Sequence, residues 1–190
     1  MRTEAGNDAV SPDAILRRLA PLIARQLGIQ AAEITPDVYL EDLGASSLDL
    51  VEITLDAERE FDVLLAGRPL FDAAVLKFGP GTLEEDGELT DAGRRLVKKR
   101  FAHLGHDEAA AMIDIADIQR QVSRVSVWTE TIAQLAAEIP ARCLEHGGQA
   151  RLGNGGIPAC ENAGDDYLRP SLDEWNEAWL SRLYDEGSSA

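Results

Sequence analysis

The sequence predicts an all-α protein, and three observations support this class. Apolar residues recur at helical spacing in several segments, from Ile15 near one end of the chain to Leu183 near the other. Serine, threonine or proline precedes several of these segments in the positions that helix starts prefer. Hydrophobic residues make up 45% of the chain and aromatic residues only 5%, so we expect a core built mainly of aliphatic side chains.

The first predicted helix begins at Ser11-Pro12-Asp13, which supplies a capping serine, a proline at the first helical position and an acid in the first turn. Gly28 is a natural stop for this helix. One face of the helix is apolar and needs a packing partner; it consists of Ile15, Leu16, Leu19, Leu22, Ile23 and Leu27.

A long loop follows the first helix, and Pro36 interrupts regular structure in it. Its spaced apolar residues are suited to anchor the loop on a helical core: Ile34, Val38, Tyr39, Leu40 and Leu43. The loop ends in a turn at Gly44, a residue type that allows the chain to reverse tightly. We therefore expect the residues after this turn to be exposed.

The second predicted helix runs from about Ser47 to Phe61 and carries three rows of side chains. Two rows are apolar, one with Leu48, Val51 and Leu55 and the other with Leu50, Ile53, Ala57 and Phe61. The third row is acidic and consists of Asp49, Glu52 and Asp56. The acidic row is either an ordinary solvated face or a docking surface for a Lys- and Arg-rich enzyme. Ser47 either caps the helix or holds a phosphate group near the positive end of the helix dipole.

Residues 11–63 resemble the first half of an acyl carrier protein. Leu43-Gly44-Ala45 and Ser47-Leu48 match the family's motif, in which Asp-Ser-Leu follows a Leu-Gly-Ala turn. Ile34-Thr35-Pro36-Asp37 is similar to the family's loop before the site. Ser46 stands where the family usually has Asp, an acid that contributes to recognition by the modifying transferase.

The resemblance implies a small helical bundle in which a serine at the start of the second helix carries the 4′-phosphopantetheine arm of coenzyme A. In this chain that serine is Ser47, flanked in the motif by Gly44, Ser46 and Leu48. The arm ends in a thiol that carries acyl groups as thioesters. The implied partners are a phosphopantetheinyl transferase and acyl-loading, acyl-transferring or ketosynthase enzymes, which would meet the acidic row of Asp49, Glu52 and Asp56.

The resemblance resumes at about residues 125–139. We therefore expect a carrier-like domain at residues 11–139 that is interrupted by an insertion at about residues 64–124. Ser126 is suited to cap the family's closing helix. The insertion enlarges the second half of the domain well beyond the size of an ordinary carrier.

Within the insertion, the sequence predicts three helices and an acidic loop. The first helix is short and apolar and starts at Leu70, the loop spans Glu84 to Glu88, and the later helices span Thr90 to about His103 and about Asp107 to Val122. The helix after Thr90 carries the chain's one basic patch, formed by Arg94, Arg95, Lys98, Lys99 and Arg100. This patch is either a solvated face paired with nearby acids, or a surface for partner selection or for the phosphate of the arm.

We expect residues 140–170 to form a Gly-rich linker and residues 171–185 to form an amphipathic C-terminal helix. Ser171-Leu172-Asp173-Glu174 has the capping-box pattern that starts a helix. The face of this helix that carries two tryptophans either packs against the rest of the chain or docks a partner. The linker holds three weak candidates for zinc ligands without a convincing fourth, so we expect no metal site; they are Cys143, His146 and Cys160.

Composition excludes some classes of function. The net charge is −16 at pH 7, from 18 basic and 34 acidic residues, which disfavours binding to nucleic acids because these require positive charge. No apolar run approaches the ~20 residues of a membrane-spanning helix. The N-terminal residues lack the apolar core of a signal peptide, so we expect a cytoplasmic protein.

The sequence therefore favours a carrier protein for a specialised fatty-acid, lipid or polyketide-type pathway. The alternative is an unmodified protein-interaction module that keeps the carrier fold, and Ser46 in place of Asp is its best support. We expect no enzymatic activity and no catalytic residues, because Ser46 and Ser47 lie outside a Gly-x-Ser-x-Gly motif. The three histidines have no recognisable pairing with a nucleophile.

Overall fold

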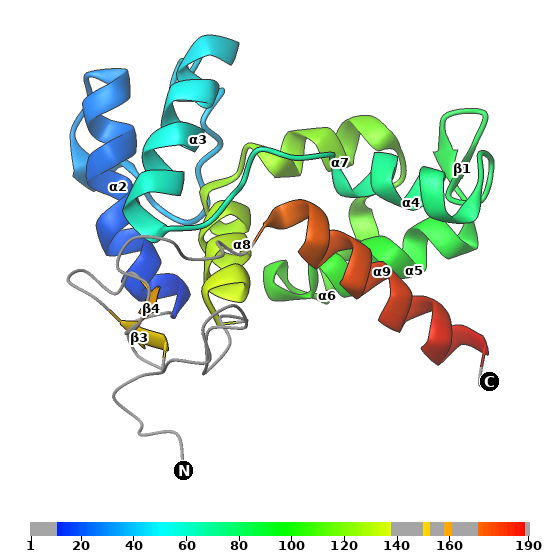
Figure 1. Ribbon diagram of the computed structural model, residues 1–190. Coiled ribbons are helices and arrows are strands. Elements are labelled where there is room, and N and C mark those ends of the chain that lie inside the picture. The colour runs from blue at the N-terminus through cyan, green and yellow to red at the C-terminus, as the bar shows by residue number, and fades with distance from the viewer. Residues whose placement is uncertain (1–10, 138–149, 153–157, 161–170, 189–190) are drawn as a thin grey trace.

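The computed structural model describes residues 11–137, 150–152, 158–160 and 171–188, and Figure 1 shows its arrangement. These residues are predominantly helical, which confirms the all-α class, and the only paired strands among them are two short hairpins. The helices are α2 (Pro12–Leu27), α3 (Ser47–Phe61), α4 (Leu70–Phe78), α5 (Asp91–Arg100), α6 (His106–Ala111), α7 (Ile115–Val122), α8 (Val125–Ala137) and α9 (Leu172–Ser188).

A bundle of α2, α3 and α8 forms the first core of the protein. Its buried side chains are mainly aliphatic, as the composition predicts, and include Ile15, Leu19, Ile23, Ile53 and Ile132. Phe61, at the end of α3, and Leu40, from the loop between α2 and α3, are also buried here. The loop is therefore held by its own apolar residues, as the sequence predicts.

The ends of α2 follow from local chemistry. The Ser11 hydroxyl accepts a hydrogen bond from the Ala14 N–H at 3.3 Å, and Pro12 fills the first helical position, where no N–H is needed. Gly28 has φ +68°, a left-handed conformation that glycine adopts without steric strain and that ends the helix. Both predicted boundaries of this helix are confirmed.

The insertion forms a second group of helices with its own apolar clusters. One cluster joins α5, α6 and α7 to α8 through Val97, Ala109, Ile118 and Val127, and another joins α4, α5 and α9. In Figure 1 this group lies on the far side of α8 from α2 and α3. Because α8 contributes Ile132 to the core and Val127 to the insertion, both parts pack on the same helix.

The predicted acidic loop in the insertion is in fact a small hairpin. Strands β1 (Glu84–Glu85) and β2 (Glu88–Leu89) pair antiparallel. Asp86 and Gly87 connect them with φ +54° and +88°, and Asp-Gly is a dipeptide that suits such turns. The sequence contained this turn signal, which the acidic character of the segment obscured.

The predicted helix from Asp107 to Val122 is wrong in one respect, because it is two helices. Asp114 separates α6 from α7, and its carboxylate accepts the Asp117 N–H at 2.8 Å and so caps α7. Just before it, the Ile113 carbonyl accepts the Leu89 N–H from the hairpin at 3.0 Å. A contact with a distant strand therefore breaks a helix whose apolar pattern is continuous.

Ser126 does not cap α8, contrary to the sequence prediction. The helix starts one residue earlier, at Val125, and the Ser126 N–H donates to the Pro36 carbonyl at 2.9 Å. The first N–H groups of α8 are thus satisfied by the α2–α3 loop and not by a capping hydroxyl. This is a tertiary contact that a local capping rule does not include.

The C-terminal helix α9 packs against both parts of the protein. Its Trp175 joins the core of α2, α3 and α8, and its Leu180 joins the cluster with α4 and α5. The Ser171 hydroxyl accepts the Glu174 N–H at 3.2 Å, which is half of the predicted capping box. Trp175 and Trp179 stack with ring centroids 6.1 Å apart. The tryptophan face is therefore a packing face.

The predicted Gly-rich linker lies largely outside the described residues. The described part of it is a second hairpin, in which β3 (Ala150–Leu152) pairs antiparallel with β4 (Pro158–Cys160). These residues are therefore paired strands and not linker.

Candidate functional site

Ser47 is the first residue of α3 and its side chain is exposed. The chain reaches it through a turn in which Gly44 has φ +87°, and a Cβ at this glycine would meet open space. Glycine is needed there for its conformational freedom and not for close packing. The predicted geometry of an exposed serine after a glycine turn is confirmed for these residues.

The cap of α3 is formed by Ser46, together with Asp49. The Asp49 carboxylate accepts the Ser46 N–H at 2.8 Å and the Ser46 hydroxyl at 2.6 Å. In return, the Ser46 hydroxyl accepts the Asp49 N–H at 3.3 Å, which completes a capping box. Ser47 is therefore not the capping residue, and its hydroxyl is not used for that purpose.

The same contacts set the charge of Asp49. Its pKa is lowered, chiefly by the hydrogen bond from the Ser46 side chain, then by the Ser46 N–H and by the side-chain amide of Gln26. Asp49 is exposed to solvent and remains a carboxylate at neutral pH. A negative charge is thus fixed two residues after Ser47.

The start of α3 suits a phosphate group on Ser47. The first N–H groups of an α-helix have no acceptor within the helix, and they coincide with the positive end of the helix dipole. Within the described part of the chain, the capping box satisfies the amides of Ser46 and Asp49. The amides of Ser47 and Leu48 lie between them, at the positions where helix starts bind phosphates. The residues present therefore fit a phosphodiester at the Ser47 Oγ.

The acidic row of α3 faces its neighbour α2 more than the sequence indicates. Gln26 donates to both Asp49 and Glu52. Asp56 pairs with Arg25 of α2 at 2.7 Å, and also with Arg59 of its own helix at 3.2 Å. The row therefore lies at the α2–α3 boundary, and each of its three carboxylates contacts a side chain of α2.

One exposed row of α3 is instead apolar. Leu48, Val51 and Leu55 are 65%, 55% and 41% exposed, although they lie one turn apart along one row that begins beside Ser47. The second apolar row is the buried one, with Ile53, Ala57 and Phe61. Sequence analysis identified both rows but did not assign either of them to the surface.

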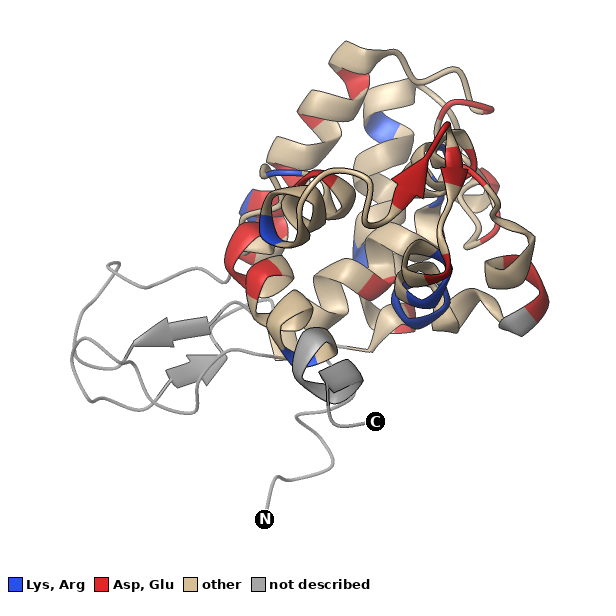
Figure 2. Ribbon diagram, turned by 90° about the vertical axis from the view of Figure 1, so that its right-hand side faces the viewer, with Lys and Arg blue, Asp and Glu red and all other residues tan. Residues whose placement is uncertain are grey.

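The basic patch on α5 is distant from Ser47. Figure 1 places α5 beyond α8, whereas α3 lies on the opposite side of the molecule. Figure 2 looks onto the insertion and shows the blue run of α5 near the red hairpin strands. In this patch, Arg94 pairs with Asp91 at 3.9 Å. The interpretation that the patch contacts the phosphate of the arm is therefore unsupported.

Two further expectations concern metals and membranes. Within the described residues, no group of three or more His, Cys, Asp or Glu side chains is arranged to hold a metal ion. Cys143 and His146 lie outside the described residues, as does the side chain of Cys160, so these weak candidates are untested. None of the described helices has both the length and the apolar character needed to cross a membrane.

Comparison with known proteins agrees with this geometry. Residues 17–77 match the protein family described as "Phosphopantetheine attachment site". A segment of 50 residues, or 26% of the chain, is 44% identical to an acyl carrier protein of Solidesulfovibrio magneticus, of which it spans 64%. The chain thus covers slightly less than two thirds of that relative. No solved structure is significantly similar to the chain.

Proposed function

We propose that residues 17–77, which match the phosphopantetheine attachment family, form a domain of the acyl carrier protein family in which Ser47 carries 4′-phosphopantetheine. The observation that supports this assignment is the position of Ser47, exposed on the first turn of α3, while Ser46 performs the capping. The modification requires a hydroxyl that does not cap the helix and that lies where a phosphate group can be bound.

The chain's own residues present the site, and partner enzymes perform the chemistry. When bound, the arm supplies a terminal thiol that carries acyl groups as thioesters. Gly44 allows the tight turn, the Ser46–Asp49 cap fixes the backbone on either side of Ser47, and the helix start accommodates the phosphodiester charge. The protein is accordingly a carrier and not itself an enzyme.

We assign partner docking to the exposed face of α3. The apolar row of Leu48, Val51 and Leu55 begins next to the attachment residue, so an enzyme that receives the arm must approach it. Glu52 lies beside this row and offers charge complementarity to a basic enzyme surface. The side-chain amide of Gln26 donates to both Glu52 and Asp49. Apolar contact supplies affinity here, and the acids supply orientation.

The partners follow from the proposed modification. They are a phosphopantetheinyl transferase, an acyl-loading enzyme, and acyl-transferring or ketosynthase enzymes of a specialised fatty-acid, lipid or polyketide-type pathway. The insertion and α9 add a large surface to the carrier core, which favours a dedicated set of partners over a housekeeping role. The expected cytoplasmic location, inferred from composition, fits such a pathway.

The test is intact-mass spectrometry after incubation with coenzyme A and a broad-specificity phosphopantetheinyl transferase. Wild-type protein should gain the mass of one phosphopantetheine group, and Ser47→Ala should gain none. Ser46→Ala is the matched control, because it removes the neighbouring hydroxyl and leaves the attachment hydroxyl in place. A gain in Ser47→Ala equal to that of wild type would refute the assignment.

The alternative, an unmodified interaction module, is favoured by one observation, which is Ser46 in the position where the family usually has Asp. If wild type gains no mass, Ser46→Asp separates the two cases. Modification of Ser46→Asp would show a carrier that needs an acid for this transferase. Failure of both proteins to gain mass would favour the unmodified module.

A further inference from the structure

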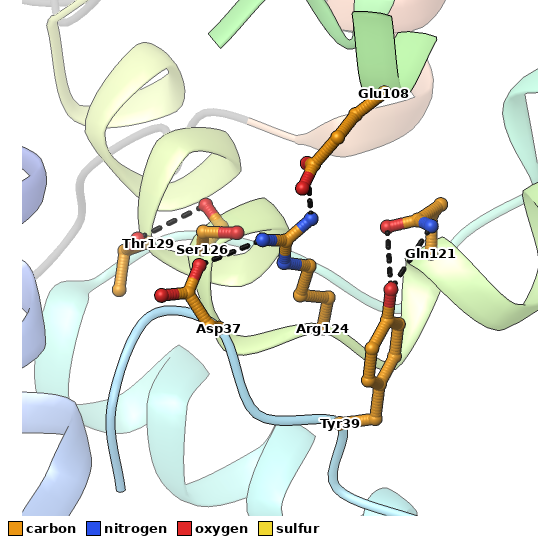
Figure 3. A network of polar contacts seen from close by, with 7 residues as sticks. All are labelled: Asp37, Tyr39, Glu108, Gln121, Arg124, Ser126 and Thr129. Carbon is orange, nitrogen blue, oxygen red and sulfur yellow. Dashed lines mark hydrogen bonds and ion pairs between the residues drawn. The ribbon is translucent and has the colours of Figure 1, made fainter. Parts of the chain in front are cut away.

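Arg124, between α7 and α8, binds one carboxylate from each part of the protein, as Figure 3 shows. Its guanidinium donates to Asp37 at 2.7 Å and to Glu108 at 2.6 Å. Asp37 belongs to the α2–α3 loop that leads to Ser47, and Glu108 belongs to α6 of the insertion. We call these three residues the Arg124 cluster.

The burial of the cluster is asymmetric. The Arg124 side chain is only 9% exposed, whereas the side chains of Asp37 and Glu108 are 82% and 51% exposed. Within the described structure, the Arg124 Nε has no hydrogen-bond acceptor. A buried cation is stabilised only as far as its partners neutralise it, so Arg124 depends on both carboxylates.

The pKa of Arg124 reflects this balance. Burial alone would lower it, but the hydrogen bonds that Arg124 donates to Glu108 and Asp37, together with the charge of Glu108, outweigh burial, and the net pKa is raised. Arg124 is therefore a cation at neutral pH.

The backbone around the cluster ties the loop to the same segment. The Leu40 N–H donates to the Ser123 carbonyl and the Val125 N–H to the Val38 carbonyl, both at 3.0 Å. These bonds flank the bridge between Tyr39 and Arg124. Any displacement of Arg124 therefore moves the backbone of the loop directly.

Side chains of α7 also contact the loop. The Gln121 amide donates to the Tyr39 hydroxyl at 3.0 Å, as Figure 3 shows, and the Arg120 guanidinium lies 4.8 Å from the centre of the Tyr39 ring. Arg120 also approaches Asp42 at 3.6 Å, close to the glycine turn. The loop from Asp37 to Asp42 thus rests on residues contributed by the end of the insertion.

We propose that the insertion positions the loop from Asp37 to Asp42, which we call the attachment loop. Glu108 of the insertion does so by binding Arg124, which in turn binds Asp37 of this loop. Glu108 and Asp37 are positioning residues, because neither touches Ser47 in the described structure. Without Glu108, the buried guanidinium has Asp37 as its remaining carboxylate partner and shifts toward solvent. The loop that it holds then opens more often. The consequence for modification rests on the proposed attachment at Ser47, whereas the structural coupling does not.

The test is hydrogen exchange of the backbone amides of Leu40 and Val125, measured by NMR on the full chain. Glu108→Ala should speed their exchange by about fivefold or more, as expected when a charged hydrogen bond that limits local opening is lost. Amides in the middle of α2 should be unchanged. The matched control is Asp72→Ala on α4, which removes an exposed carboxylate from another helix of the insertion.

A double-mutant cycle tests whether the effect passes through Arg124. Asp37→Ala and Glu108→Ala should each speed exchange modestly, and the double variant should speed it more than the product of the two, because Arg124 then has neither carboxylate. Multiplicative effects, or unchanged exchange in Glu108→Ala, would overturn the proposal.

The rate of phosphopantetheine attachment provides the functional measurement. Glu108→Ala should raise the transferase KM for the protein with little change in kcat, because a mobile loop presents Ser47 correctly less often. Absence of any attachment to both wild type and Ser46→Asp would refute the proposed function and leave the exchange result standing. Faster exchange with an unchanged KM would support the coupling between Glu108 and the loop, but it would refute the inference that this coupling helps to present Ser47 to the transferase.

Discussion

Replacement of Gly93, in the first turn of α5, tests how closely this helix packs against the hairpin of the insertion. A Cβ built on this residue would lie 2.1 Å from the Leu83 carbonyl oxygen and 3.1 Å from the Leu89 Cδ2. Ordinary contact begins at 3.4 Å, so the helix and the hairpin would have to separate by about 1.3 Å. The Leu83 oxygen also accepts the Thr90 N–H at 3.0 Å, which fixes it in place.

Two effects of Gly93→Ala oppose each other. Alanine is favoured over glycine in a helix interior by about 1 kcal/mol. Overpacking a tight site costs about 1–3 kcal/mol, and the upper end applies here because the clash is with a backbone atom that no rotamer change can move. We expect a net loss of about 2 kcal/mol in the free energy of unfolding.

The measurement is urea denaturation followed by circular dichroism. Gly87→Ala in the hairpin turn is the control, because its φ of +88° is unfavourable for alanine but a Cβ there would meet open space. This control should lose only about 1 kcal/mol, the usual difference for a left-handed position. A Gly93→Ala variant as stable as wild type would refute the close approach of α5 to the hairpin.

Two further predictions concern charged groups. Burial lowers the pKa of Arg100 to about 10, and its hydrogen bonds go to the neutral side chains of Thr131 and Gln134. Arg100→Met should therefore change the free energy of unfolding by less than about 1 kcal/mol. Arg100→Ala should lower it by about 2–3 kcal/mol, because it opens a cavity. Equal losses for the two variants in urea denaturation would contradict this. Asp49 has a lowered pKa in the folded state, so its contribution to stability is present above its unfolded pKa and is lost as pH falls through the folded pKa. An NMR titration should give a higher midpoint for Asp49 in Ser46→Ala, and an unchanged midpoint would contradict the role of the cap.

The parts of the fold that the sequence predicts are those fixed by neighbours in the chain. Both ends of α2 depend on a capping serine, a proline and a glycine that lie at those ends. The start of α3 at Ser47 depends on the glycine turn before it and the cap at Ser46. Such signals act within about four residues, so a single sequence contains all the information they need.

The features that the sequence did not predict depend on contacts between distant segments. The break at Asp114 requires the hairpin to meet Ile113, and the start of α8 requires Pro36 to meet Ser126. The Arg124 cluster joins residues 87 and 16 positions away from Arg124 along the chain. Spacing within one helix likewise could not decide which apolar row of α3 is buried, because that depends on where α2 and α8 lie.

The placement of the insertion explains how a carrier can be enlarged without blocking its site. The chain leaves α3 at Phe61, at the opposite end from Ser47, and a helix of this length separates the two by about 20 Å. The chain returns through α7 and Arg124, which contact the loop before Ser47. The departing end is thus far from Ser47, the proposed attachment residue, and the returning end is close to the loop that precedes it. An insertion at this point leaves the exposed face of α3 open, while its last residues lie where they can hold the attachment loop.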